Sequence, residues 1–255
     1  MQSLLKNYRT NILAILLLIF AWQTIYYIAS EPMVFPSLYD IAISATQVIP
    51  TELFWITYFK TMLTLAQAWF LAIVLVIFTV CVCSLNTVVR QVFEKYCSYF
   101  MPLPSFVIIP FVTLILGLGK SALLIVMVFS VFWAMSFQLL GAFDTAKLNY
   151  SKHVKNLGWG LYKSIFLVYI PAAAPTIFAI CSMGWTYMWR VLISIEVAYG
   201  AIGGYYGLGT YMIEVKNKLD VQIMYVILLT IAITGVAINS FISYLSKRYN
   251  WKDIL

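Results

Sequence analysis

Six long stretches of the chain contain no Asp, Glu, Lys or Arg, and this feature constrains the fold more than any other. A helix rises about 1.5 Å per residue, so about 20 apolar residues cross a hydrocarbon core about 30 Å thick. Each stretch has between 21 and 29 residues, and they are residues 10–30, 61–89, 96–119, 121–143, 164–189 and 221–246. They predict an all-α integral membrane protein in which six transmembrane helices form one transmembrane domain over residues 1–255.

The composition excludes a soluble protein. Hydrophobic residues make up 63% of the chain and charged residues only 10%, whereas an ordinary globular protein has about 25% charged residues. A transmembrane barrel is excluded as well, because its strands alternate in polarity and runs such as residues 13–20 do not. The basic residues behind the net charge of +7 are placed as membrane topology requires, so the charge does not indicate binding to nucleic acid.

The residues between the six stretches predict the orientation of the chain. Short loops rich in Lys and Arg usually remain in the cytoplasm. With both termini cytoplasmic, the inner segments hold eleven Lys and Arg against three Asp and Glu, and the outer segments hold five against six. We therefore expect both termini in the cytoplasm. The first stretch is expected to be a retained anchor, because the core of a cleaved signal has only about 7–15 residues.

Three irregular segments carry the information about function, and the first is a group of prolines. Pro102, Pro104 and Pro110 interrupt the third stretch. Proline cannot donate a backbone hydrogen bond and clashes with the preceding turn, so this helix is predicted to be kinked or to start late. Such breaks are tolerated in a bilayer only against protein or a water-filled cavity. The prolines therefore form either a packing kink or part of the wall of a pathway.

The Gly119-Lys120-Ser121 triplet that follows resembles the end of a phosphate-binding loop. The motif G-x-x-x-x-G-K-[ST] requires a first glycine, and this chain has Leu114 at that position. We interpret the triplet as a tight turn between two spans. The chain is therefore not expected to bind ATP, and we expect no catalytic site, cofactor or metal site in it.

The second irregular segment is the basic inner connection, residues 144–163. It is too polar to span the membrane. Apolar residues interleave with lysines before Gly158 and Gly160, which predicts a short amphipathic helix with a glycine stop, lying parallel to the membrane. Its lysines fit contact with anionic lipid as well as with a protein partner. His153 is the only histidine of the chain, so a metal site there is not expected.

The third irregular segment is the outer Gly/Tyr-rich segment, residues 196–220. Glycine permits backbone conformations that other residues avoid, so a folded-back loop is predicted more readily than a helix. Arg190 and Glu196 stand near the outer end of the fifth stretch. Charges at such depth are costly unless they are paired or hydrated. They are predicted either to pair or to belong to a gate.

Several of these residues resemble one family. Gly158, then nine residues, then Val-Tyr-Ile ending in Pro171 resembles the second half of the E-A-A-x3-G-x9-I-x-L-P motif of binding-protein-dependent ABC importer permeases. Lys152-His153-Val154 stands where that family usually has Glu-Ala-Ala. Other pieces resemble the sulfonate, taurine, nitrate and thiamine-precursor branch of the family: Phe35-Pro36-Ser37, Met101-Pro102-Leu103-Pro104, Ile109-Pro110, Gly117-Leu118-Gly119, Trp189 to Glu196, and Gly207-Leu208-Gly209.

The resemblance implies a permease of the type I importer fold in the bacterial inner membrane. It implies two copies of the chain, an ATPase dimer that binds ATP and Mg, an extracytoplasmic substrate-binding protein, and surrounding lipid. The departure from Glu-Ala-Ala implies an altered or dedicated ATPase. The residues implied in ATPase coupling are Lys152, His153, Val154, Lys155, Gly158 and Pro171. Those implied in the pathway or gate are Pro102, Pro104, Pro110, Trp189, Arg190, Glu196, Gly207 and Gly209. The solute is expected to be a small organic anion or zwitterion.

Two other classes of protein share the hydropathy pattern. A membrane redox subunit or enzyme would need titratable or metal-binding residues facing one another within the spans, and one histidine with scattered cysteines does not supply them. A passive channel differs from an importer in needing no ATPase.

Overall fold

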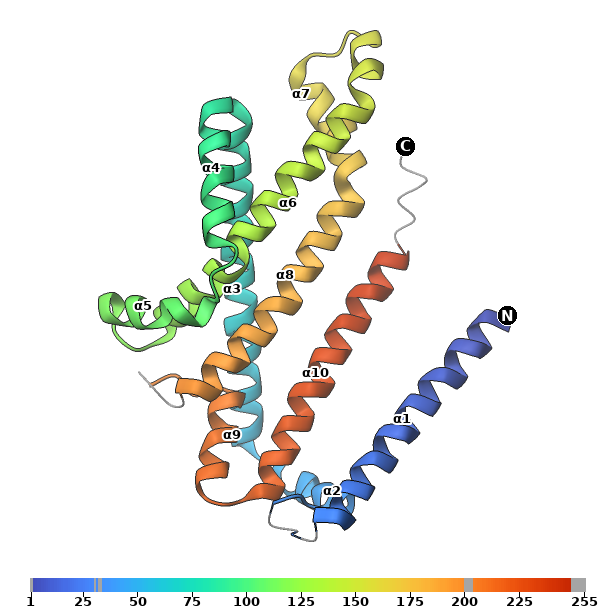
Figure 1. The fold of residues 1–255 in the computed structure, drawn as a ribbon, viewed down its shortest axis with the longest axis vertical. Helices are drawn as coiled ribbons and strands as arrows, with labels where there is room; N and C mark the ends of the chain where they lie inside the picture. Colours follow the sequence, from blue (N-terminus) through green and yellow to red (C-terminus); the bar gives the residue numbers. More distant parts are fainter. Residues whose placement is uncertain (1, 30, 32–33, 200–203, 249–255) are drawn as a thin grey trace.

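The computed structural model describes residues 2–29, 31, 34–199 and 204–248, and every regular element within them is helical (Figure 1). In chain order the elements are α1 (Gln2–Ala29), α2 (Leu38–Val48), α3 (Glu52–Leu85), α4 (Thr87–Phe100), a 3-10 turn (Ser105–Ile108), α5 (Ile109–Leu116), α6 (Lys120–Asn156), α7 (Leu161–Ser164), a π-helical turn (Ile165–Tyr169), α8 (Ile170–Tyr199), α9 (Leu208–Asn217) and α10 (Val221–Arg248).

Five helices are long and apolar enough to cross a membrane within the described part of the chain. They are α1, α3, α6, α8 together with the π-helical turn, and α10. Helix α4 and the segment formed by the 3-10 turn and α5 are a bent pair, and they make a sixth span if they are counted as one crossing. The predicted all-α membrane fold is therefore confirmed, with the third span as its irregular member.

The third span is broken rather than kinked. Helix α4 and the segment Ser105–Leu116 are bent by 97° from each other. The break lies at Pro102 and Pro104, because two prolines so close together leave no continuous set of helical backbone donors. Pro110 lies in the first turn of α5, where a missing backbone N–H costs nothing. Of the three prolines, two therefore break the span and one starts a helix.

Helix α6 is the centre of the bundle, and its most extensive contacts are with α8 and α3 (Figure 1). Small residues allow the helices to come close. A Cβ atom on Gly184 of α8 would lie 2.5 Å from the sulfur of Met135 in α6, and one on Gly235 of α10 would lie 3.0 Å from Nε1 of Trp189. Trp189, predicted as a gate residue, is therefore a buried contact between α8 and α10.

The inner connection does not contain a separate amphipathic helix, so this prediction is wrong. Helix α6 continues from Lys120 to Asn156 without interruption. At 1.5 Å per residue, a helix of 37 residues is about 55 Å long, which exceeds a hydrocarbon core of about 30 Å. The chain from Asp144 onward lacks a proline or glycine until Gly158. The helix therefore continues beyond the apolar stretch as a projecting end.

The outer segments also contain more helix than predicted. Ser37 caps α2 by accepting a hydrogen bond from the backbone N–H of Asp40 at 3.1 Å, and Thr51 caps α3. Trp22, Phe35 and Tyr225 form an aromatic cluster with centroid distances of 4.6 to 5.8 Å, which ties α1 to α10. Helix α9 (Leu208–Asn217) lies within the segment predicted as a folded-back loop.

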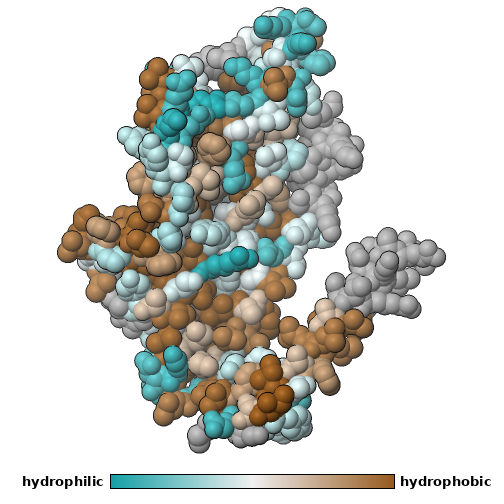
Figure 2. Space-filling view, in the orientation of Figure 1, coloured by the Kyte–Doolittle hydropathy of each residue, from teal (hydrophilic) through white to brown (hydrophobic). Residues whose placement is uncertain are grey.

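The longest predicted inner connection and two of the predicted outer segments lie at opposite ends of the bundle (Figure 1). Helices α2 and α9 lie at one end, and the junction of α6 with α7 lies at the other. Figure 2 shows hydrophilic residues gathered at the α6–α7 end and a strongly hydrophobic surface on the side where α5 lies. This separation fits the orientation that the basic residues predict.

Candidate translocation and coupling sites

Glu196 is the best-defined polar centre near the end of the bundle that is predicted to be the outer one. Its side chain is 2% exposed although α8 is otherwise apolar there. The carboxylate accepts hydrogen bonds from the hydroxyl of Thr61 at 2.9 Å, the hydroxyl of Tyr205 at 2.8 Å and the backbone N–H of Gly209 at 2.7 Å. Burial raises the pKa of the Tyr205 hydroxyl, which keeps this group a donor. We call Thr61, Glu196, Tyr205, Gly207 and Gly209 the outer cluster.

The two glycines are needed because the chain passes very close to the carboxylate. A Cβ atom on Gly207 would lie 2.2 Å from Oε1 of Glu196 and 2.6 Å from Oγ1 of Thr61. One on Gly209 would lie 2.7 Å from the Cβ of Glu196. Thr61 also accepts a hydrogen bond from the backbone N–H of Leu208 at 2.8 Å. Backbone flexibility was therefore the wrong reason for these glycines, and close packing is the right one.

Arg190 and Glu196 do not pair with each other. They are six residues apart on one helix, and this spacing places them on different faces. Arg190 is exposed, and its guanidinium has no ion-pair partner within the described residues. It lines a groove of about 460 Å³ together with Pro104 and Ser194. The groove joins one of the predicted wall prolines to the predicted gate arginine, whereas Pro102 and Pro110 are not among its lining residues.

Three hollows follow one another along this half of the molecule. The Arg190 groove shares Ile195 and Tyr199 with a cavity of only about 30 Å³. That cavity is also lined by Glu196 and shares Tyr205 with a third hollow of about 220 Å³. A space of 30 Å³ holds about one water molecule. Glu196 and Tyr205 of the outer cluster therefore line the smallest of the three hollows.

The projecting end of α6 is basic and exposed. Lys152, His153 and Lys155 are exposed, while Val154 is 7% exposed and packs into the core. Gly158 ends the helix with a backbone φ of +64°. The N–H of Gly158 donates to the carbonyl of Lys155, and that of Trp159 donates to the carbonyl of Val154. This is the hydrogen-bond pattern of a Schellman C-cap, which favours glycine.

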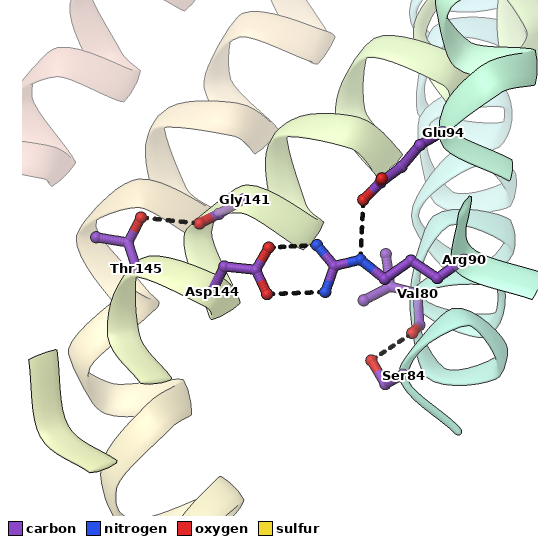
Figure 3. Close-up of polar contacts among 7 residues, drawn as sticks. All are labelled: Val80, Ser84, Arg90, Glu94, Gly141, Asp144 and Thr145. Atoms are coloured by element: carbon purple, nitrogen blue, oxygen red, sulfur yellow. Dashed lines mark hydrogen bonds and ion pairs between the residues drawn. The ribbon is translucent and has the colours of Figure 1, made fainter. Parts of the chain in front are cut away.

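An ion-pair group connects this end of α6 to α4 (Figure 3). Both guanidinium NH groups of Arg90 donate to the carboxylate of Asp144, one of them at 2.8 Å. The Nε of Arg90 donates to Glu94 at 2.8 Å. A bidentate pair of this kind fixes orientation as well as distance. It holds the start of the projecting end of α6 against α4, the first helix of the broken span.

Pro171 follows an irregular turn in the structure. The π-helical turn Ile165–Tyr169 precedes it, and α8 then continues through Pro175. Pro171 cannot donate to the carbonyl of Leu167, so widening of the preceding turn relieves the ring clash. The fifth span is therefore irregular just before Pro171.

Sequence reasoning missed Thr61, Tyr205 and the Arg90–Asp144 pair. Thr57, Thr61 and Thr64 are buried on one face of α3, and their helical spacing could have indicated a polar contact within the bundle. Tyr205 was noticed only as part of a tyrosine-rich segment. Arg90 and Asp144 were assigned to separate loops, and no local pattern connects residues 54 positions apart.

Comparison with known proteins agrees with this geometry. No curated protein matches the chain. Residues 81–251, which are more than half of the chain, match a protein family described as the binding-protein-dependent transport system inner membrane component. The match includes the break at Pro102 and Pro104, the projecting end of α6 and the outer cluster residues of α8 and α9. The chain therefore belongs to the family of binding-protein-dependent transport system inner membrane components, the permeases of ABC transporters.

Proposed function

We propose that the chain forms the translocation pathway of an ATP-driven importer, in which motion of a docked ATPase enters through the projecting end of α6. Family membership makes the chain a multi-pass inner-membrane transport subunit without ATPase activity, in a system with an ATPase and a binding protein. The observation that carries the proposal is the continuity of α6. One helix extends from the hollows near the outer cluster to the basic end at Lys152.

The projecting end has the properties that a docking surface requires. Lys147, Lys152 and Lys155 are exposed, and Leu148 and Leu157 are 81% and 57% exposed beside them. Apolar side chains within a basic surface fit a groove with an acidic rim on the partner ATPase. ATP and Mg bind elsewhere on that ATPase subunit. The residues proposed for coupling are therefore Lys152, His153, Val154, Lys155 and Gly158, with Pro171 at the base of the next span.

Displacement of this end would reach the gate through packed helices. Ala122 and Val126 of α6 line the narrow cavity beside Glu196, and α6 has its largest contact with α8. A rigid helix transmits a displacement along its whole length. Closure of the ATPases would shift α6 against α8 and open or close the narrow hollow, and ligands would bias the balance between the two states.

A second copy of the chain would complete the pathway. The break between α4 and α5 leaves Met101 and Leu103 exposed, each at 43%. Irregular backbone at membrane depth requires protein or water around it. Phe111, Leu114 and Ile115 of α5 are 67% to 84% exposed beside the break, so this surface suits a homodimer contact, with lipid around the remaining faces.

We further propose that the solute is a small organic anion or zwitterion, as transported by the sulfonate, taurine, nitrate and thiamine-precursor branch that the motifs resemble. Among the described residues that line the Arg190 groove, Arg190 is the only charged side chain, and none is a carboxylate. A bare metal cation would find no carboxylate there. The substrate-binding protein would make most of the selection between solutes.

Uptake into proteoliposomes tests the proposed function. The chain is reconstituted with its ATPase and binding protein, and solute uptake is measured with ATP and Mg, with a non-hydrolysable nucleotide, and without nucleotide. We expect uptake only with ATP and Mg, because only hydrolysis resets the two states. Uptake of equal rate without nucleotide would identify a passive channel and reject the proposal.

A further inference from the structure

The third hollow, of about 220 Å³, is lined by two lysines that have no role in the transport mechanism proposed above. Lys60 of α3 and Lys120, the first residue of α6, line a space of about 220 Å³ together with Thr64, Gly204, Tyr205 and Tyr206. These residues come from segments that are far apart in the sequence. Two lysines thus line one small space that has no carboxylate among its described lining residues, while the hydroxyls of Tyr205 and Tyr206 donate to Glu196 and Glu214. Such a space is suited to an anion of a few heavy atoms.

Both lysines lack an ionic partner within the described residues. The residues between Tyr199 and Gly204 carry no carboxylate in the sequence. Glu196 is nearby, but the donors of the outer cluster occupy its oxygens. Glu214, which contacts Tyr206, is paired with Lys218 at 2.6 Å. Neither Lys60 nor Lys120 is therefore paired with a carboxylate of the described residues.

A second observation points to the same ligand class. The Arg190 groove at the other end of the three hollows also holds an unpaired cation and no carboxylate. In addition, Gly119 provides no side-chain cap for α6, so the positive end of the helix dipole adds to the charge of Lys120. Unpaired cations thus lie on both sides of the narrow cavity. A negatively charged group would meet favourable charge before and after that cavity.

We infer that the Lys60–Lys120 hollow is an entry site that binds the anionic group of the transported solute, a carboxylate, sulfonate or phosphate. The inference rests on the importer function proposed above, and narrows its solute to anions. Two lysines attract such a group from solution because their fields add at the hollow. Because the hydroxyl of Tyr206 already donates to Glu214, the two ammonium groups would supply the hydrogen bonds to the anion. The phosphate of an anionic lipid has the same chemistry, so the test separates the two sources.

The test is equilibrium binding to the purified permease in nanodiscs, which requires neither ATPase nor transport. A failure here is therefore distinct from a failure of ATP-driven uptake. The probes are acetate, methanesulfonate and methylammonium, and the methyl protons of all three report binding by saturation-transfer difference NMR. The discs contain either phosphatidylcholine alone or added phosphatidylglycerol. The variants are Lys60→Gln, Lys120→Gln and their double variant, with Lys216→Gln as a matched exposed outer lysine outside the hollow.

We expect saturable signals from acetate and methanesulfonate in both kinds of disc, and none from methylammonium. Each single variant should weaken binding about fivefold, because each removes one unit charge at close range, and the double variant should abolish it. Lys216→Gln should bind normally, and Lys60→Arg with Lys120→Arg should keep binding because the charge remains. Unchanged anion binding in a folded double variant overturns the inference. Loss of the anion signal on adding phosphatidylglycerol also overturns it, because a lipid headgroup would then occupy the hollow.

Discussion

Replacing Gly207 with alanine is expected to reduce uptake at least tenfold and to lower the free energy of unfolding by about 3 kcal/mol. The added Cβ would lie 2.2 Å from Oε1 of Glu196 and 2.6 Å from Oγ1 of Thr61. Neither atom can retreat freely, because both are buried and hydrogen-bonded. Overpacking of a buried site typically costs about 1–3 kcal/mol, and each displaced hydrogen bond to the carboxylate adds to that cost.

Unfolding of the purified permease in detergent measures the stability change, and uptake in proteoliposomes measures the functional change. Gly141→Ala is the matched control, because within the part of the chain that the structure describes no atom lies within 4 Å of the added Cβ on that helical glycine. The control should transport normally and gain up to about 1 kcal/mol of stability. A Gly207→Ala protein as stable and as active as the control would show that the outer cluster is not closely packed.

Replacing Gly158 with valine is expected to reduce uptake about tenfold while the outer cluster remains intact. Gly158 has a φ of +64°, where a β-branched residue is strongly disfavoured. The cost is about 1–2 kcal/mol, and the chain can avoid it by changing the direction of the turn after α6. The docking surface would then be presented wrongly to the ATPase. The measurement is uptake at saturating ATP together with the affinity of the permease for the ATPase.

Two control substitutions separate backbone strain from loss of space. No atom of the described residues lies within 4 Å of a Cβ built on Gly158 or Gly160, so crowding is not the cause of the effect. Gly158→Asn should retain most activity, because asparagine tolerates the left-handed conformation. Gly160→Ala should be nearly neutral, because Gly160 has no positive φ. Equal losses in all three variants would indicate a requirement for glycine unrelated to φ.

The sequence was sufficient to predict the membrane fold, because apolar length alone determines which helices can cross a bilayer. It was insufficient to place the ends of those helices. Lys60, Arg90 and Arg190 were expected to lie between spans, yet all three lie in helices. Charged residues with long side chains form helix readily and can extend toward water. Helix ends therefore depend on caps such as Thr51 and Gly158 more than on where charge begins.

The candidate sites were predicted in part. The resemblance grouped Glu196 with Gly207 and Gly209, and the structure brings these residues together. It did not reveal Thr61, whose hydroxyl is 135 positions away from Glu196 in sequence. The pattern of residues 144–163 is the same for an interfacial helix and for the projecting end of a long helix. Only the packing of Val154 and the ion pair at Asp144 distinguish the two.

Site-directed crosslinking from the end of α6 tests the central claim most directly. A photo-crosslinker is attached at Lys152→Cys in the complete transporter in lipid, after removal of the four native cysteines, and the products are identified by mass spectrometry. Lys216→Cys, at the opposite end of the bundle, is the matched control. We expect products between position 152 and the ATPase subunit, and none with that subunit from position 216. Products with lipid alone, or with the binding protein, from position 152 would contradict it.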